Sequence, residues 1–314
     1  MKAFSKERQR SLFDGRKVSA VLPYASFDQN PSFIQGGMGR LSISGAQEKY
    51  GLVEENSLLR LSTEQEHARY ILKPAPYDRR FLYRADMPAN ECLTMDIAQE
   101  VYHIPAAPRA ICYFGNGEAA YLTKRFDYNA DGKKYKVEDF ASAAKVNKDT
   151  NGEDYKYTAR SYEECVEMIR EHCIAAEVEV LKFFRLLLFN YLFSNGDAHL
   201  KNFTFIEYRE GDVRLSPAYD LLNTNLHLPS SIFALEKGLF KEGTPITDTT
   251  PIGRPLFLHF GRRIHLSEKM LQRELEYFSA DHAKTKELIE NSLLSPDAKH
   301  AYLLDYKYRL STLQ

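Results

Sequence analysis

The chain has 314 residues, more than a single hydrophobic core usually spans, so we expect two lobes. A hydrophobic fraction of 44% and a charged fraction of 27% exclude a disordered or fibrous protein. The net charge of −1, from 42 basic and 43 acidic residues, gives no electrostatic reason to expect broad binding to nucleic acids or membrane surfaces.

Cysteine usage and hydropathy both predict a cytoplasmic protein. The four cysteines form no C-x-x-C pair and no dense framework, which favours a reducing compartment. The most apolar stretch, residues 180–193, is too short to span a bilayer and is interrupted by Lys182 and Arg185, so it reads as a core helix. Residues 1–15 are charged and lack the apolar segment of a signal peptide.

The first patterned segment in chain order is rich in glycine. Residues 36–45 contain four glycines in ten positions. Glycine lets the backbone approach an anion closely, so such a segment can surround phosphates with its N–H groups. A flexible loop before a strand is the alternative.

The next part of the chain predicts several strands and one helix. Strands are expected at 50–53 and 69–73, the second ending at Pro74. Apolar spacing predicts a helix over 90–102 with one buried face. An Asn-Gly turn indicates a hairpin over 111–123.

Helical patterns dominate after a polar stretch at 127–160. We expect helices at 161–172 and 175–193, and a last helix from Ser295 to near Leu310. The spacing of three tyrosines on this last helix suits core packing. They are Tyr302, Tyr306 and Tyr308.

These elements predict an α+β fold with two lobes. The N-lobe, residues 1–126, is small and rich in strands, and carries the glycine-rich segment and a strand lysine. The C-lobe, residues 127–314, is larger and mostly α-helical. The boundary follows from the change in composition near Asp127.

That strand lysine is Lys73, which ends an apolar strand. Burying its charge is costly unless it meets an anion, although a lysine at such a place commonly extends to water. Glu91 lies eighteen positions later, on the next expected helix. A strand lysine followed by a helix glutamate is the arrangement by which kinases hold the phosphates of ATP. Glu91 is therefore the candidate ion-pair partner of Lys73.

Two further motifs follow the most apolar helix. Asp197 and Asn202 form D-x-x-x-x-N, the spacing at which kinases place a proton-accepting Asp and an Mg²⁺-ligating Asn. A turn that ends the helix is the alternative. Asp220 follows a hairpin expected over 204–215, where a kinase places its second metal-binding aspartate, but the Phe and Gly of D-F-G are absent. His199, inside the loop, is expected to stabilise it or to contact phosphate.

The order of these residues favours a kinase over other chemistries. The nine histidines are scattered, and no H-E-x-x-H or paired Cys/His spacing exists, so a zinc site is not expected. No G-x-S-x-G is present, which weighs against an α/β-hydrolase.

Five motifs in this order resemble the HipA-type serine/threonine kinase toxins of bacterial toxin–antitoxin systems. They are SISGAQEK at 42–49, NE at 90–91, KRFD at 124–127, GDAHLKNF at 196–203 and SPAYD at 216–220. The resemblance covers about residues 36–225 through these motifs. It implies a bilobed protein-kinase-like fold and the phosphorylation of a protein on Ser or Thr, with ATP and Mg²⁺.

The resemblance also implies roles for single residues. By matching positions, Asp197 would accept the hydroxyl proton, and Asn202 and Asp220 would bind Mg²⁺. Ser42 matches the autophosphorylated serine, whose modification ejects the loop and inactivates the kinase, and Ser44 is a second candidate. ATP contacts are implied for a larger set, namely Ser44, Gly45, Ala46, Gln47, Glu48, Lys49, Lys73, Lys124, Arg125, Phe126, His199, Lys201 and Tyr219.

Partners are implied by the resemblance as well. Because Ser42 follows only 41 residues, the chain resembles the short, HipT-like form that lacks an N-terminal subdomain. A small HipS-like protein would then supply the missing piece, and a HipB-like antitoxin would bind DNA. The known targets of the family are aminoacyl-tRNA synthetases, whose phosphorylation halts growth.

Two other functions stay open from the sequence. A pseudokinase-like module could act by binding antitoxin complexes, although all four catalytic-type residues are present. They are Lys73, Asp197, Asn202 and Asp220. A small-molecule kinase on the same fold is the other alternative. Residues 223–262 could form the acceptor platform or a plain connector.

Overall fold

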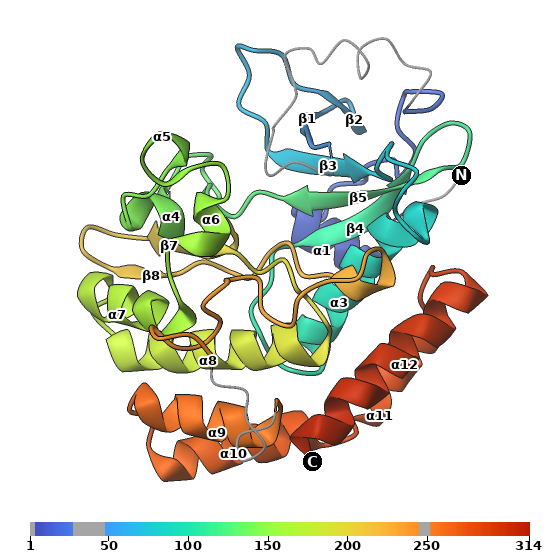
Figure 1. Ribbon diagram of the computed structural model, residues 1–314. Helices are drawn as coiled ribbons and strands as arrows, with labels where there is room; N and C mark the ends of the chain where they lie inside the picture. The colour runs from blue at the N-terminus through green and yellow to red at the C-terminus, as the bar shows by residue number, and fades with distance from the viewer. Residues whose placement is uncertain (1–3, 28–47, 245–251) are drawn as a thin grey trace.

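The structure is a computed structural model that describes residues 4–27, 48–244 and 252–314 (Figure 1). A five-stranded sheet lies at one end of the molecule and a larger helical part at the other. The expected α+β class, a β-rich part followed by a larger and mostly helical part, is confirmed. No helix in these described ranges is long and apolar enough to cross a membrane.

The five-stranded sheet is antiparallel throughout, in the order β2-β1-β3-β5-β4. Its strands are β1 (Tyr50–Glu55), β2 (Leu58–Leu61), β3 (Tyr70–Pro74), β4 (Arg109–Tyr113) and β5 (Ala119–Lys124). The strands expected at 50–53 and 69–73 and the hairpin expected over 111–123 are confirmed, and β2 is an addition. Asn56 and Ser57 join β1 to β2 with φ of 50° and 63°, which suits the twist of a two-residue hairpin turn.

Two helices pack on this sheet, α1 (Lys6–Phe13) and α3 (Met87–Glu100). The Oγ of Ser5 caps α1 by accepting a hydrogen bond from the N–H of Arg8 at 3.2 Å. Leu12 and Phe13 are fully buried in the apolar cluster formed with the strands. A 3₁₀ turn, η1 (Arg84–Asp86), precedes α3. Because α3 begins at Met87, before the expected start at residue 90, Glu91 lies in the second turn of the helix.

The helical part is built around a central helix, α8, which contacts α7, α10 and α12. Its helices are α7 (Tyr162–His172), α8 (Ala176–Leu192), α9 (Arg254–Arg263), α10 (Glu268–Ser279), α11 (Ala283–Glu290) and α12 (Pro296–Leu313). The helices expected at 161–172 and 175–193 are confirmed. A capping box between Ser161 and Glu164 begins α7.

The last helix, α12, corrects two details of the sequence analysis. It extends beyond the expected end near Leu310. Tyr302 and Tyr306 are buried as expected, but Tyr308 is 65% exposed. Residues four apart share one face of a helix, whereas Tyr308 follows Tyr306 by only two positions and therefore points elsewhere.

A second antiparallel sheet, in the order β6-β7-β8, supports the loops of the helical part. Its strands are β6 (Lys136–Asp139), β7 (Thr204–Glu207) and β8 (Val213–Leu215). The hairpin expected over 204–215 is confirmed, and β6 lies in the polar stretch. Five short helical segments accompany this sheet and its loops. They are α4 (Phe140–Ala143), α5 (Lys148–Asn151), α6 (Tyr155–Thr158), η2 (Leu200–Asn202) and η3 (Thr224–Leu226).

Candidate active site

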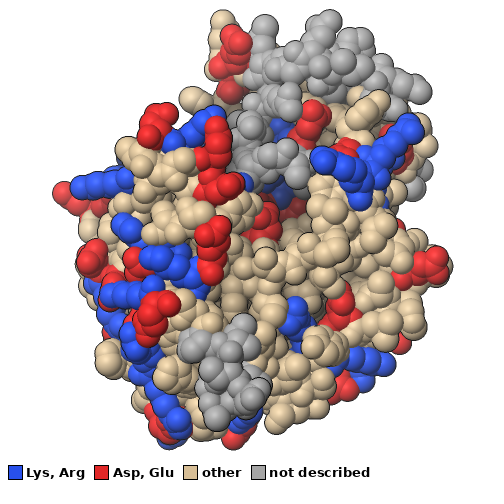
Figure 2. Space-filling view, viewed as in Figure 1, with Lys and Arg blue, Asp and Glu red and all other residues tan. Residues whose placement is uncertain are grey.

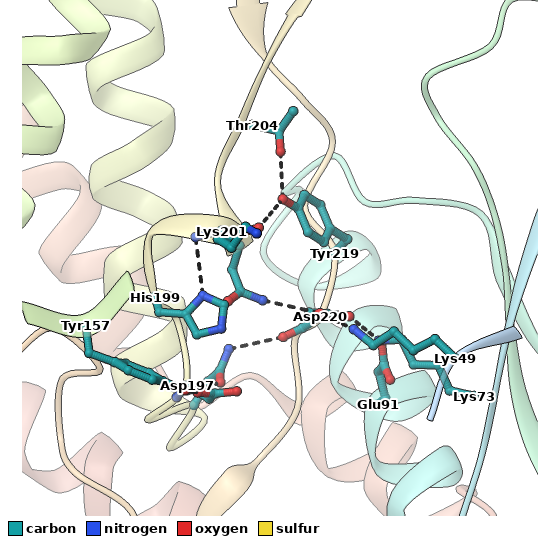
Figure 3. Close-up of polar contacts among 12 residues, drawn as sticks. Lys49, Lys73, Glu91, Tyr157, Asp197, His199, Lys201, Thr204, Tyr219 and Asp220 are labelled. Atoms are coloured by element: carbon teal, nitrogen blue, oxygen red, sulfur yellow. Dashed lines mark hydrogen bonds and ion pairs between the residues drawn. The ribbon is translucent and has the colours of Figure 1, made fainter. Parts of the chain in front are cut away.

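A buried ionic cluster joins the sheet to the loops of the helical part (Figure 3). The Nζ of Lys73, on the central strand β3, lies 2.6 Å from Oε1 of Glu91 on α3 and also contacts Oδ1 of Asp220. The Nζ of Lys49, just before β1, lies 2.9 Å from Oδ2 of Asp220. Lys49, Lys73 and Glu91 are 5%, 4% and 1% exposed, so their charges depend on one another rather than on water.

The pKa values in the cluster show which groups are mutually stabilised. Burial alone would raise the pKa of Asp220, but the charges of Lys49 and Lys73 outweigh it and hold that pKa well below its usual range. Burial would lower the pKa of Lys73, but Asp220 and Glu91 raise it. Burial lowers the pKa of Lys49 and raises that of Glu91 despite their partners. Asp220 is therefore the anionic centre of the cluster.

The backbone at Asp220 is in the left-handed region, with φ of 56°. An aspartate tolerates this conformation at some cost in free energy, and such residues commonly occur at functional sites. The neighbouring backbone is fixed, because the N–H of Ala218 donates to the carbonyl of Pro105 at 2.7 Å. The hydroxyl of Tyr219 lies 2.7 Å from both the carbonyl of Lys201 and Oγ1 of Thr204. These contacts direct the Asp220 carboxylate at the lysines.

Asp197 lies in the loop that follows α8. Its Oδ1 accepts a hydrogen bond of 2.7 Å from the hydroxyl of Tyr157 on α6. Burial raises the pKa of Asp197, while the Tyr157 hydrogen bond and the charge of Lys156 oppose the rise. The sequence gives no signal for Tyr157, because it lies in a polar stretch without periodicity.

His199 is buried in the same loop and caps η2. Its Nδ1 accepts a hydrogen bond from the N–H of Lys201 at 3.3 Å, and its ring meets that of Tyr157 edge-on at 5.1 Å. Burial, helped by the charge of Lys156, lowers the pKa of His199 to about 3. The imidazole is therefore neutral and contributes to the shape of the loop.

Asn202 and Asp220 are the residues on which a divalent cation was expected. The Nδ2 of Asn202 donates to Oδ2 of Asp220 at 3.3 Å, whereas its Oδ1 is buried and has no hydrogen-bond partner among the described residues. A buried carbonyl oxygen beside a carboxylate fits a hard cation such as Mg²⁺. The described ranges hold no group of three or more His, Cys, Asp or Glu that could bind a metal, so these two side chains alone would not complete the coordination of a cation.

Two cavities meet at the cluster. The larger, about 770 Å³, is lined by residues of the sheet and of the segment that leaves β5, among them Tyr121, Phe126 and Tyr219. The smaller, about 580 Å³, is lined by Asp197 and by residues of α6 and of the segment after η3. Four residues line both cavities, namely Lys49, Lys73, Glu91 and Asp220. The cluster thus lies on the border between two binding spaces.

Residues 124–126, at the end of β5 and just after it, were expected to contact ATP. The N–H groups of Lys124 and Arg125 donate to the carbonyls of Pro108 and Arg69. The Nζ of Lys124 lies 3.0 Å from Asp14, outside the cluster. The ring of Phe126 lies 5.4 Å from that of Tyr219 and forms an aromatic wall. Lys124, Arg125 and Phe126 all line the larger cavity, and the two N–H groups are already engaged in hydrogen bonds to the protein.

Some predicted site residues are not placed by the structure. Ser42, Ser44, Gly45, Ala46 and Gln47 lie outside the described residues. Glu48 is described, and its carboxylate accepts a hydrogen bond from the Tyr50 hydroxyl. Lys201 lines the larger cavity.

Gly196 is the position in the Asp197 loop where a side chain has no room. A Cβ there would lie 2.2 Å from the carbonyl oxygen of Ser231. We expect Gly196→Ala to lower the free energy of unfolding by about 3 kcal/mol, because the backbone at Gly196 or at Ser231 must move to make room for the Cβ. Gly211→Ala is the control, since nothing lies within 4 Å of its added Cβ and only its φ of +78° opposes the change. Urea denaturation of both variants measures the difference, and equal costs would contradict the close packing at Gly196.

Known proteins resemble this chain along most of its length. The model of the HipA-like C-terminal domain matches residues 41–283. A Haemophilus influenzae protein named "Putative kinase" is 25% identical over an alignment 333 positions long, which covers 100% of this chain and 93% of that protein. "Putative kinase Y4mE" of Sinorhizobium fredii is 31% identical over 194 residues, 59% of this chain and 43% of that protein.

Two solved structures share the fold. A chain of the Shewanella oneidensis complex of HipA, HipB and operator DNA superposes with a TM-score of 0.66 at 20% identity, over 90% of this chain and 66% of that one. The Helicobacter pylori proinflammatory kinase CtkA superposes with a TM-score of 0.57 at 16% identity, over 94% and 95% of the two chains. At these identities the likeness establishes the fold alone, and the expected kinase-like fold is confirmed.

Proposed function

This chain belongs to the family of the HipA-like C-terminal domain, and we propose that it is an ATP-dependent serine/threonine protein kinase. The observation that carries the proposal is that the ion-paired Lys73 and Asp220 line two adjoining cavities, the smaller of which is also lined by Asp197. A phosphoryl group is transferred between two substrates, so a transferase needs two binding spaces that meet at its charged groups. The names of the relatives and of CtkA agree with a kinase.

In this proposal the larger cavity holds the nucleotide between a lobe of residues 1–126 and one of 127–314. Lys73, held by Glu91, presents its charge to the phosphates, and Lys49 adds a second charge. Asp197, on the other side of the cluster, accepts the proton of the attacking hydroxyl. Lys73 is held by Glu91 before substrate binds, so this charge needs little reorganisation during the reaction.

Asn202 and Asp220 are the residues that would hold Mg²⁺. The partnerless Oδ1 of Asn202 and the carboxylate of Asp220 support this assignment. Mg²⁺ supplies charge neutralisation for phosphate oxygens. Asp220 would then exchange part of its contact with Lys49 or Lys73 for the cation, since both lysines now occupy its oxygens.

We further propose that the kinase acts as a toxin of a toxin–antitoxin system. The HipA structure that shares its fold was solved with HipB and operator DNA, which supports a HipB-like antitoxin as partner. The earlier resemblance adds a HipS-like protein and an aminoacyl-tRNA synthetase as substrate. Autophosphorylation at Ser42 or Ser44 would add about −1.5 to −2 charges to the chain a few positions before Lys49, and we propose that this charge disfavours the binding of nucleotide phosphates.

The test is transfer of ³²P from γ-labelled ATP by the purified protein with Mg²⁺, alone and with bacterial lysate. We expect label on the protein and on at least one lysate protein, and no label when EDTA removes the metal. Mass spectrometry of the labelled bands identifies the acceptor residues. ATP binding without any transfer would contradict the proposal and favour a pseudokinase-like module, whereas label on small molecules alone would indicate a small-molecule kinase.

A further inference from the structure

The hydroxyl of Tyr157 occupies one of the hydrogen-bonding positions of the Asp197 carboxylate. It donates a hydrogen bond of 2.7 Å to Oδ1 of Asp197 (Figure 3). A general base must be within hydrogen-bond reach of the proton that it takes, so an acceptor hydroxyl would donate to the same carboxylate. Tyr157 and an acceptor would therefore compete where the acceptor approaches the same oxygen, Oδ1 of Asp197.

The backbone of Tyr157 is fixed by two hydrogen bonds, whereas its side chain is held by the contact with Asp197, by the His199 ring at 5.1 Å and by the Nζ of Lys156, 4.8 Å from the ring centroid. The N–H of Tyr157 donates to the carbonyl of Asp154 at 2.8 Å, and its carbonyl accepts from the N–H of Glu236 at 3.0 Å. The side chain is only half-buried. Its hydroxyl makes the contact with Asp197, and a change of χ1 would remove the hydroxyl without moving α6.

The space next to Tyr157 suits part of a protein chain. The cavity of about 580 Å³ runs from Asp197 to an apolar wall that includes Phe81, Met87 and Leu228. Charged side chains of both signs, Lys156 and Glu236, also line it. A cleft of this size with apolar walls and a few polar groups is typical of a binding site. Basic and acidic side chains are also intermixed on the face of the molecule shown in Figure 2, so that face indicates no ligand of a single charge sign.

We propose that this cavity is the acceptor site and that Tyr157 occupies the place of the acceptor hydroxyl until a substrate displaces it. The inference rests on the proposed kinase function and adds the residue that limits access to Asp197. The acceptor is a protein segment whose serine or threonine takes over the hydrogen bond to Asp197. Its oxygen then bonds to the γ-phosphorus of ATP, its proton passes to Asp197, and the bond from phosphorus to the bridging oxygen breaks to release ADP.

The alternative is that the Tyr157 hydroxyl only orients Asp197. The two roles predict opposite effects of removing it. If the hydroxyl holds the acceptor's place, Tyr157→Phe opens that place. If it orients the carboxylate, the same change lowers the turnover number.

Water is the acceptor probe that needs no knowledge of the natural substrate. In the absence of a protein acceptor, we expect Tyr157→Phe to raise the kcat of ATP hydrolysis about tenfold and to leave KM for ATP unchanged. The reason is that the Tyr157 hydroxyl no longer competes with water for a hydrogen bond to the charged Asp197 carboxylate. Tyr155→Phe is the matched control, since Tyr155 lies on the same helix outside the lining of this cavity. The gain should vanish in the double variant Tyr157→Phe/Asp197→Asn.

Thermal unfolding and ATP binding of Tyr157→Phe show whether the variant is folded. Unchanged or lower hydrolysis in a folded variant would overturn the inference while leaving transfer by the wild-type protein, and hence the proposed function, intact. Phosphate found on Tyr157 itself would also overturn it, because the residue would then be an acceptor and not its placeholder. If neither protein turns over ATP, the inference falls together with the kinase proposal.

Discussion

Replacing Asp197 with asparagine is expected to lower kcat for phosphoryl transfer by about 10² to 10⁴, the contribution typical of a positioned general base. An amide has the shape of the carboxylate but cannot take up the hydroxyl proton. The hydrogen bond from Tyr157 can persist, because the amide oxygen still accepts it. The variant should therefore fold as the wild-type protein does and fail in the chemical step.

Nucleotide binding separates this outcome from a folding defect. Asp197 lines the smaller cavity, so Asp197→Asn should bind ATP with unchanged affinity in a titration. Asp149→Asn, an exposed aspartate on α5, is the matched control and should retain full activity. A loss of less than tenfold in Asp197→Asn would mean that another group accepts the proton.

The elements that periodicity predicts are those whose own residues make the core. Strands β3 and β5 and helices α7 and α8 carry apolar positions at the spacing of their structure, so the sequence alone predicts them. Helix α1 is not predicted from the sequence, because only two of its residues, Leu12 and Phe13, are buried. Packing of these two side chains on the sheet stabilises the helix. Strand β6, KVED, is an edge strand with few apolar positions.

The candidate site also contains contacts that the sequence predicts and contacts that it does not. The order of Lys73, Glu91 and Asp220 along the chain suggests that they meet, and the structure brings these three together. The contact of Tyr157 with Asp197 could not be predicted, because no local pattern distinguishes this tyrosine from its neighbours. Contacts of this kind depend on which loops tertiary packing brings side by side, and a single sequence carries no record of that.

Lys73→Met is expected to lower the free energy of unfolding by about 3–5 kcal/mol, the usual cost of removing one partner from a buried ion pair. Glu91 would stay in place, 1% exposed, and its Oε2 already has no hydrogen-bond partner among the described residues. Asp220 would still keep Lys49. The charge that loses its ion-pair partner is therefore mainly that of Glu91.

The double variant Lys73→Met/Glu91→Leu is the control that isolates this charge. Apolar replacement of both partners of a buried pair is often neutral, so most of the lost stability should return in urea denaturation. A double variant as unstable as Lys73→Met would show that lost packing, not the unpaired carboxylate, causes the defect.

The pH dependence supplies an independent check on the same carboxylate. Burial already raises the pKa of Glu91, and Lys73 is the main group that lowers it, so Lys73→Met raises it further. A carboxyl with a raised pKa in the folded state binds its proton more tightly there than in the unfolded chain. Its stabilising protonation is complete below the usual pKa of 4.5 and is lost as the pH rises through the raised value. The deficit of Lys73→Met relative to wild type should therefore be smaller at pH 5 than at pH 8, and a deficit independent of pH would mean that Glu91 is not the group left unpaired.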